Sequence, residues 1–245
     1  MDRLNSMVKV DARRMFTSAP FYVLCGVALA MPILILVMTS MAGGGDAMAF
    51  TSTWRIIGSE GGMDRMNMDM TAMCNINLMF FMAGLFVCAF VAEDFKSGYV
   101  KNLFTVRAKK GDYVASKTIV CFIACALFLI AFFVGAVLGG AIAGLSFELG
   151  AAGIQGLVMC MLAKIFLMAV FVAIAVLVSV FAKQRLWLSV LLFLFGGMLL
   201  FMMIPMLTPL NSGVMNVGMC LVGGAIFAVA LGHVSKLALK KMDLV

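Results

Sequence analysis

Long apolar segments alternate with short polar ones along most of this chain. Each apolar segment matches or exceeds the roughly 20 residues that a helix needs to cross the hydrocarbon core of a bilayer. The last two segments meet at a stretch rich in Pro, Asn, Ser and Gly, where Pro205 and Pro209 leave open a short re-entrant helix. The pattern predicts six membrane-spanning helices, at about residues 21–41, 73–92, 118–143, 154–182, 186–206 and 215–234.

The composition agrees with this interpretation. Hydrophobic residues make up 64% of the 245 residues and charged residues only 12%, with a mean hydropathy of +1.15, whereas soluble domains contain roughly 45–50% apolar residues. The first apolar segment is longer than the ~7–15 residues of a signal-peptide core, so we expect it to be retained as a span. We predict an all-α, polytopic membrane protein that forms a single domain over residues 1–245.

The basic residues predict how the chain is oriented. Lys and Arg concentrate in the N-terminal segment, in residues 93–117, after the fourth span and in the tail, and such an excess marks cytosolic segments. Only Arg55, Arg65 and Lys164 fall outside these segments. We therefore expect a multi-pass protein of the cell membrane with both termini in the cytosol and residues 43–71 outside.

Residues 1–18 carry apolar side chains on one helical face and most of their charges elsewhere. We expect an amphipathic helix that lies in the inner membrane interface. A charged tail that only orients the first span is the alternative. The apolar face consists of Leu4, Met7, Val8, Ala12, Met15 and Phe16.

Residues 93–117 form the longest strongly charged segment between two apolar ones. Apolar residues within it recur at three- and four-residue spacing, the period of one helical face. A short helix here would turn Lys96 and Lys101 away and present an apolar stripe to a partner protein. The stripe consists of Phe95, Tyr99, Leu103 and Val106.

Three polar residues lie in or near the predicted spans. Asn75 and Asn77 occur near the outer end of the second span, where they either line a water-filled path or reach water at the interface. Lys164 precedes the end of the fourth span at residue 182 by about 27 Å of helix, at ~1.5 Å per residue. We expect its side chain to extend to the outer interface rather than to bind substrate.

Small residues at four-residue spacing predict close packing of the third span. The pairs are Gly135 with Gly139 and Gly140 with Gly144. Such pairs let two helix backbones approach closely, either within one subunit or between subunits.

The outer loop ends in a group of soft sulfur donors of the kind that binds Cu(I). The chain contains 24 methionines, which occur in five of the six predicted spans, all except residues 118–143, and neither His nor paired Cys accompanies the group. The seven cysteines also lack paired spacing, so we expect neither a disulfide framework nor a metal site. A copper-handling permease remains a narrow alternative, with Met63, Met66, Met68, Met70, Met73 and Cys74 as its donors.

Several catalytic motifs are absent from the sequence. There is no Gly-rich loop ending in Gly-Lys-Ser or Gly-Lys-Thr, so the chain does not bind ATP by that route. A single His excludes a His-based zinc site of the metalloprotease type. No pair of carboxylates lies within a span, which argues against a proton-relay pump. We expect a protein that is not an enzyme, holds no cofactor of its own and takes its driving force from elsewhere.

The six spans, the amphipathic N-terminus and the first cytosolic loop together resemble the type-2 ATP-binding-cassette (ABC) transporter permeases. In that family an acidic residue ends the second span, a small residue and Gly follow, then come Lys-Asn-Leu-like residues and a basic patch, and a Lys opens the third span. The sequence-specific part of the resemblance covers residues 92–117. Its matching positions are Glu93, Ser97, Gly98, Lys101, Asn102, Leu103, Arg107 and Lys117.

The resemblance implies partners and roles. Two permease subunits, identical or paralogous, would pair with two cytosolic ABC ATPase subunits that bind ATP and Mg²⁺, within the lipid bilayer and without nucleic acid. The first cytosolic loop would be the coupling helix, residues 1–18 a connecting helix, and the substrate path would lie near spans two and five, with Asn75 and Asn77 as candidates. The docking residues would be Glu93, Asp94, Phe95, Ser97, Gly98, Tyr99, Leu103, Arg107 and Lys117.

The function implied is export of an amphiphilic cargo, such as a drug, an antimicrobial peptide or a lipid, driven by the separate ATPase. A passive pore, or a membrane anchor or receptor subunit that recruits a cytosolic partner through the same loop, is the competing class. A docking helix does not by itself reveal what docks, so ATPase activity of the complex in lipid is the observation that separates the two classes.

Overall fold

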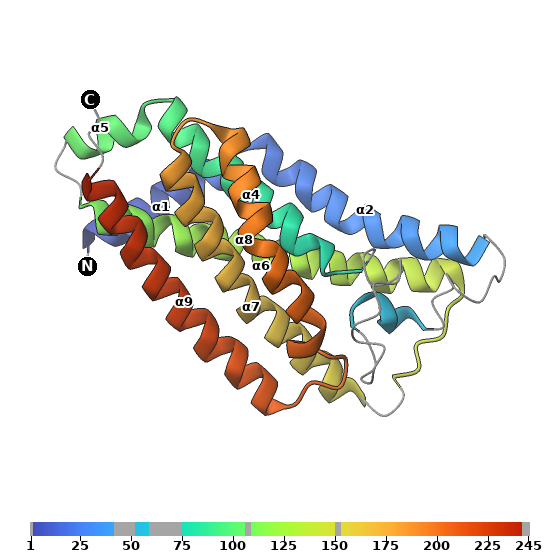
Figure 1. The fold of residues 1–245 in the computed structure, drawn as a ribbon. Helices are drawn as coiled ribbons and strands as arrows, with labels where there is room; N and C mark the ends of the chain where they lie inside the picture. The colour runs from blue at the N-terminus through green and yellow to red at the C-terminus, as the bar shows by residue number, and fades with distance from the viewer. Residues whose placement is uncertain (1, 42–51, 59–74, 106–108, 150–152, 242–245) are drawn as a thin grey trace.

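The computed structural model describes residues 2–41, 52–58, 75–105, 109–149 and 153–241 (Figure 1). These residues form helices and connecting turns, with no β-strand among them. The elements are α1 (Asp2–Phe16), α2 (Ala19–Met41), the 3₁₀ helix η1 (Thr53–Ile56), α4 (Leu78–Lys96), α5 (Tyr99–Thr105), α6 (Lys110–Ala143), α7 (Gly153–Ala182), α8 (Leu186–Leu207) and α9 (Val214–Lys241).

The prediction of six spans is confirmed. Six helices of the described chain, α2, α4, α6, α7, α8 and α9, are long and apolar enough to cross a membrane. Their ends differ from the expected ones where a span continues into polar sequence. Helix α6 begins at Lys110 rather than at about residue 118, so that Lys117 lies two turns inside a helix and not in a loop.

The helix ends gather at two opposite ends of the bundle. The N-terminus of α1, the short helix α5 and the C-terminal end of α9 lie together at one end, whereas η1 lies toward the other (Figure 1). This grouping agrees with the charge pattern, which assigns the first end to the cytosol. The side of the membrane that each end faces stays a prediction.

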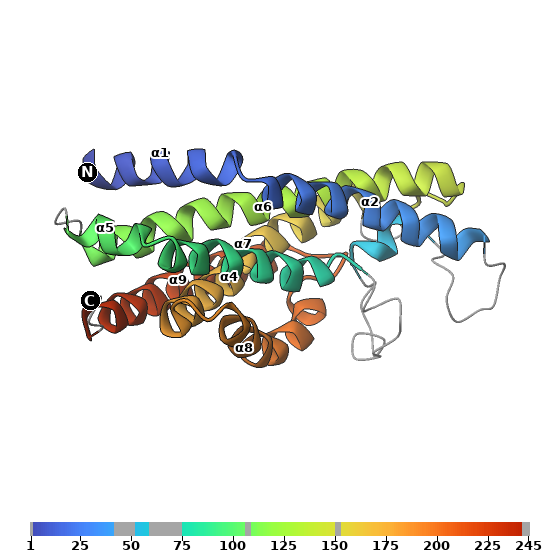
Figure 2. The same cartoon turned by 90° about the horizontal axis from the view of Figure 1, so that it is seen from above.

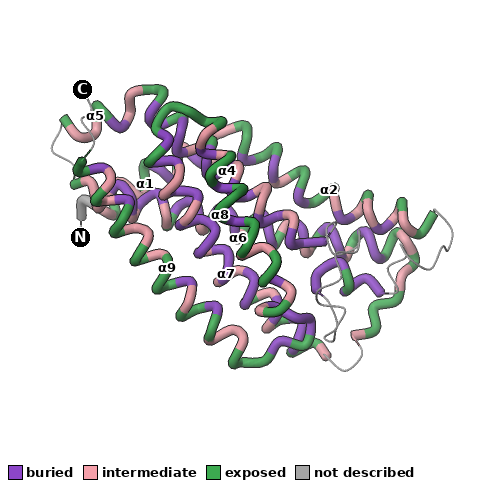
Figure 3. The backbone as a smooth tube through the Cα atoms, in the orientation of Figure 1, coloured by how far each residue is buried: buried purple, intermediate pink, exposed green. Residues whose placement is uncertain are grey.

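Helices α4 and α7 are the inner helices of the bundle. Seen from above, α1 and α2 lie along one side and α8 along the opposite side, with α4 and α7 between them (Figure 2). Helix α7 packs against α4, α6, α8 and α9, and its residues are mostly buried, while α8 and α9 are mostly exposed (Figure 3). Large exposed side chains such as Phe195, Leu199 and Val229 make this outer surface apolar, as contact with lipid or another subunit requires.

Glycines allow two of the closest helix contacts. A Cβ at Gly139 would lie 2.7 Å from the Cα of Ile33, and one at Gly135 would overlap the carbonyl oxygen of Leu29, so this predicted pair packs α6 on α2 within the subunit. The second predicted pair acts differently, because Gly140 faces Thr53 of η1 and the next glycine simply ends α6.

The connection between α8 and α9 is a turn. Helix α8 continues through Pro205 to Leu207, residues 208–213 form the turn, and α9 begins at Val214. The open alternative of a re-entrant helix between these spans is therefore not what the described chain adopts. The turn is closed by the Ser212 hydroxyl, which donates to the Pro209 carbonyl at 2.6 Å.

Candidate functional site

The candidate site begins at the elbow, by which we mean residues 93–105, the last turn of α4 and all of α5. The Ser97 N–H donates to the Glu93 carbonyl at 2.8 Å, and Gly98 then takes a left-handed conformation with φ of +74°. Glycine adopts this conformation without strain, and it is a common way to end a helix. The chain therefore changes direction at Gly98, and α5 starts anew at Tyr99. The predicted short helix is present as α5, but it begins at Tyr99, and Phe95 of the apolar stripe belongs to the last turn of α4 instead.

The apolar side chains of the elbow turn inward. Phe95 and Val100 are buried, and Tyr99 and Leu103 are half-buried against the core of the same subunit. Phe104 contacts the ring of Tyr113 edge-on, with 5.9 Å between ring centroids. The stripe predicted to face a partner thus anchors the elbow to its own bundle, as far as the described residues extend. Val106 and Arg107 lie outside them.

The outward surface of the elbow is polar instead. Lys96, Lys101 and Thr105 are exposed, and so are the docking candidates Glu93 and Ser97. A partner that meets this end of the bundle encounters charged and hydroxyl groups first. Whether an ATPase contacts these residues stays a prediction.

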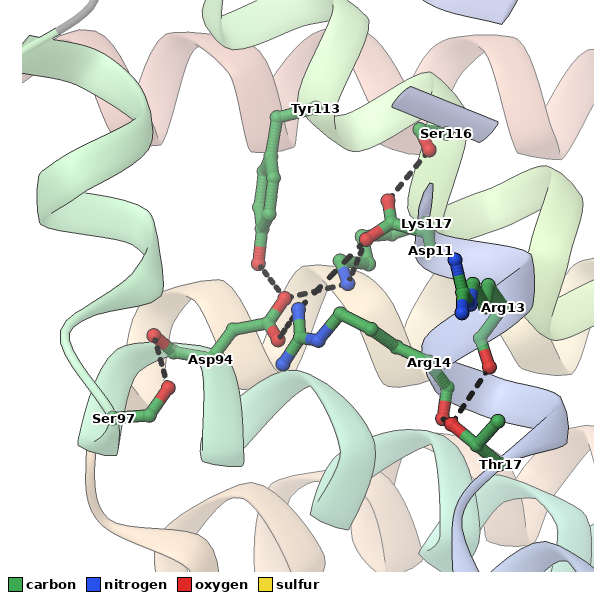
Figure 4. A network of polar contacts seen from close by, with 9 residues as sticks. All are labelled: Asp11, Arg13, Arg14, Thr17, Asp94, Ser97, Tyr113, Ser116 and Lys117. Carbon is green, nitrogen blue, oxygen red and sulfur yellow. Dashed lines mark hydrogen bonds and ion pairs between the residues drawn. The ribbon is translucent and has the colours of Figure 1, made fainter. Parts of the chain in front are cut away.

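Behind the elbow lies a cluster of buried charges that we call the latch. Its centre is Lys117 of α6, which is fully buried. The Lys117 Nζ lies 2.8 Å from Oδ1 of Asp11 on α1 and 2.6 Å from Oδ2 of Asp94 on α4 (Figure 4). One ammonium thus joins three helices. The latch consists of Asp11, Arg14, Asp94, Tyr113, Ser116 and Lys117.

Arg14 supplies the second positive charge of the latch. Its Nη1 lies 2.9 Å from Oδ1 of Asp94 and 3.9 Å from Oδ1 of Asp11. Burial disfavours the charged guanidinium, but Asp94, Tyr99 and Asp11 together outweigh burial, and the pKa of Arg14 is raised. The guanidinium also lies over the ring of Tyr99, 4.2 Å from its centroid, and so ties α1 to the elbow directly.

Hydroxyl groups complete the latch. The Ser116 Oγ donates to Oδ2 of Asp11 at 2.6 Å, and the Tyr113 hydroxyl donates to Oδ2 of Asp94 at 3.1 Å (Figure 4). Two carboxylates therefore face two cations and two hydroxyl donors, and the cluster carries no net charge. Buried ions persist in a protein when they are paired and hydrogen-bonded in this way.

This arrangement is suited to holding helices together rather than to catalysis. Each carboxylate is paired with Lys117 and accepts a hydrogen bond from a hydroxyl, so both are engaged within the subunit. Burial, with a smaller contribution from the Asp11 carboxylate, raises the pKa of Tyr99, which keeps its phenol neutral. The latch fixes α1, α4 and α6 relative to one another directly behind the elbow.

Sequence reasoning identified only part of this cluster. Asp94 and Lys117 were among the predicted docking residues, but both are fully buried and bind within the subunit. Asp11 was missed, although it shares a helical face with Met7 and Met15 at four-residue spacing. An acidic residue on the apolar face of an amphipathic helix is the signal that it needs a buried cation.

The polar residues at the other end are buried as well. Asn75 and Asn77 are 6% and 3% exposed, and the Asn75 Oδ1 accepts from the Asn77 N–H at 2.8 Å. They therefore face the protein, and a role in a substrate path stays a prediction. The expectation that Lys164 extends outward is wrong, because it is fully buried and its Nζ donates to Asn77 Oδ1 and Thr208 Oγ1, each at 2.9 Å.

The proposed copper donors from Met63 to Cys74 lie outside the described residues. Within the described part, no group of three or more His, Cys, Asp or Glu side chains is placed to hold a metal ion.

Comparison with known proteins identifies the family. Residues 17–200 match the family model described as "ABC-2 family transporter protein". A search of curated proteins and a search of solved structures gave no match. The matched segment covers more than half of the chain and runs from α2 into α8, with Asp94 and Lys117 inside it and Asp11 and Arg14 before it. The chain therefore belongs to the ABC-2 transporter family and is a membrane permease of an ABC transporter.

Proposed function

We propose that this chain is the permease subunit of an ABC exporter, and that a separate cytosolic ATPase drives it through the elbow. The observation that supports this most directly is the latch. Because Lys117 and Arg14 pair with Asp11 and Asp94, a movement of the elbow would be coupled to α1, α4 and α6. A force that the ATPase exerts on the elbow would therefore be transmitted to helices that cross the membrane.

The partner in this proposal is a pair of ABC ATPase subunits, which bind ATP and Mg²⁺ and bring them to the complex. The permease offers them the exposed polar side of the elbow, including Lys101, Asn102 and Thr105, and the exposed face of α1 beside it, with Lys9 and Arg13. This differs from an apolar docking stripe, because the apolar side chains of the elbow already pack on the subunit itself.

The proposed mechanism is a change between two states of the bundle. Nucleotide binding and hydrolysis shift a permease only if the ATPase contacts the elbow differently in the two states. The latch, in which two carboxylates are paired with two cations, would stay intact through the change. The inner helices α4 and α7 would then move relative to the outer ones, and a second permease copy or a paralogue would complete the path.

The cargo in this proposal is amphiphilic. The exposed surfaces of α8 and α9 are apolar, whereas buried polar side chains lie inside the bundle near each of its two ends. A molecule with both a hydrocarbon part and a polar group suits such a boundary. The complex would reside in the cell membrane, with the elbow and both termini in the cytosol, as the charge pattern predicts.

The docking part of the proposal is tested by reversing charge on the exposed elbow. Lys101→Glu combined with Thr105→Glu leaves the buried side of α5 unchanged and should reduce both co-purification of the ATPase from native membranes and the ATPase activity of the complex. Arg55→Glu, which changes an exposed cation on η1 at the far end, is the matched control. Normal yield and activity of the complex with the doubly changed elbow would count against docking at this surface.

A further inference from the structure

Three side chains at the end of the bundle opposite the elbow form a second polar cluster, the outer clasp, which consists of Asn77, Lys164 and Thr208. Lys164 projects from α7, and its partners stand where α4 begins and where α8 ends. The ammonium is 0% exposed and donates to the amide oxygen of Asn77 and the hydroxyl of Thr208. A lysine carries three N–H donors, so two described bonds leave one for another acceptor.

Both partners of Lys164 are neutral. Within the described residues no carboxylate lies at ion-pair distance from it, whereas the equally buried Lys117 has two. Burying an ammonium without a negative partner costs free energy of desolvation. Charged side chains within membrane spans are therefore usually functional. The outer clasp thus has the donor and the charge of an anion site, but the described chain supplies no anion.

Short segments cover the outer clasp. Cys160, one helical turn before Lys164, contacts the Thr208 carbonyl at 3.4 Å. Gly58, just after η1, packs so tightly against this region that an added Cβ would lie 3.2 Å from the Leu210 N and 3.4 Å from the Cys160 Sγ. Among the described residues, the cover therefore includes Gly58 and the turn at residues 208–213. Both are short segments outside the spanning helices, so a movement of them would uncover the ammonium without separating those helices.

We propose that Lys164 is the binding group for the anionic head of an amphiphilic molecule, a single carboxylate or phosphate joined to a hydrocarbon chain. Asn77 and Thr208 hold the ammonium in place while the site is empty, and the anion takes the remaining N–H when the cover moves. The identification of this molecule as cargo rests on the proposed export function. Binding of the anion at Lys164 does not.

The test compares three amphiphiles with the same chain length. Purified full-length protein in neutral dodecyl maltoside is titrated with dodecyl phosphate, dodecanoate or zwitterionic dodecylphosphocholine, and the midpoint of thermal unfolding is followed. We expect the two anionic amphiphiles, or one of them, to raise the midpoint and the zwitterionic one to leave it unchanged. Which of the two anions acts identifies the head group as phosphate or carboxylate.

Variants assign the effect to the outer clasp. Lys164→Met should weaken the response to the anionic amphiphile by about tenfold or more, as loss of one charge-assisted hydrogen bond implies. Lys164→Gln keeps hydrogen-bonding groups at this position without the charge and should weaken it similarly, which guards against a Met variant that folds poorly. Lys164→Arg and Thr208→Val both keep a cation in place and should retain the preference for the anion.

Two results would overturn the proposal. One is an anionic preference of the same size in wild type, Lys164→Met and Lys164→Gln, which would place the binding on surface cations. The other is the absence of any anionic preference in the wild-type protein, whatever the variants do to the unfolding midpoint, which would make the outer clasp a structural contact. The assay involves no ATPase and no transport step. A failure of the export proposal would therefore not change the conclusion on whether the anion binds at Lys164.

Discussion

Lys117 and Lys164 are both completely buried lysines on spanning helices, yet their surroundings differ in kind. Lys117 is held by two carboxylates, so its charge is compensated within the subunit. Arg14 pairs with one of the same carboxylates, that of Asp94. Lys164 is held by an amide and a hydroxyl. The first environment is complete and suits a fixed joint, whereas the second is short of negative charge and suits a group that exchanges partners.

The largest effect should come from removing the charge of Lys117. Lys117→Met leaves Asp11 and Asp94 buried with Arg14 as the one cation that the described residues place against them, and removal of one member of a buried ion cluster typically costs about 3–5 kcal/mol of unfolding free energy. Denaturant unfolding of the purified protein in detergent measures it. Lys96→Met, at an exposed lysine of the same end, should change the free energy by less than about 0.5 kcal/mol. Equal behaviour of the two variants would mean that the latch does not hold this end together.

A smaller loss should follow from Asp11→Asn. The amide keeps an acceptor for the Ser116 hydroxyl but removes one of the two negative charges that face Lys117. This change should lower the free energy of unfolding by about 1–3 kcal/mol. A double-mutant cycle with Lys117→Met should give a coupling free energy of about 0.5–3 kcal/mol, because the two residues are in direct contact. Strict additivity would show that α1 is held by its apolar face alone.

The contact between α1 and the elbow should contribute less again. Tyr99→Ala removes the ring beneath Arg14, and an exposed to half-buried cation–π contact is worth about 0.5–2 kcal/mol. Tyr99→Phe keeps the ring and should behave like wild type. In the assembled complex, Tyr99→Ala should also lower ATPase activity more than Tyr99→Phe does. If both variants lose stability equally, the hydroxyl rather than the ring is the important group.

The sequence predicts the six spans well because bilayer thickness fixes the length of an apolar helix. It also predicts the amphipathic helix α1, where local periodicity decides the conformation, but it does not predict the break at Gly98 between α4 and α5. It cannot tell which way an amphipathic face turns. Periodicity identified Phe95, Tyr99 and Leu103 as one face, and only the packed structure reveals that this face meets the subunit's own core.

Buried polar partners are the harder problem, since they come from distant parts of the chain. Residue counting along α7 placed Lys164 at an outer interface, but the oxygens that bind it belong to Asn77 and Thr208, far away in sequence. The partners of Lys117 were missed in the same way, because Asp11 lies on a different helix. Sequence reveals that a charge in a span needs a partner, and the fold decides which residue that is.

The smallest change in unfolding free energy is expected for Lys164→Met. This small change distinguishes Lys164 from Lys117. Lys164→Met removes a buried charge that neutral groups hold, so the loss of its hydrogen bonds is offset by removal of the desolvation cost of the ion. Thr208 keeps its bond to the Ile204 carbonyl at 2.8 Å, so chiefly the Asn77 oxygen loses a partner. The unfolding free energy without added ligand should therefore change by less than about 1 kcal/mol. A loss as large as that of Lys117→Met would show that Lys164 has a fixed negative partner in the apo protein and would remove the distinction between the two lysines.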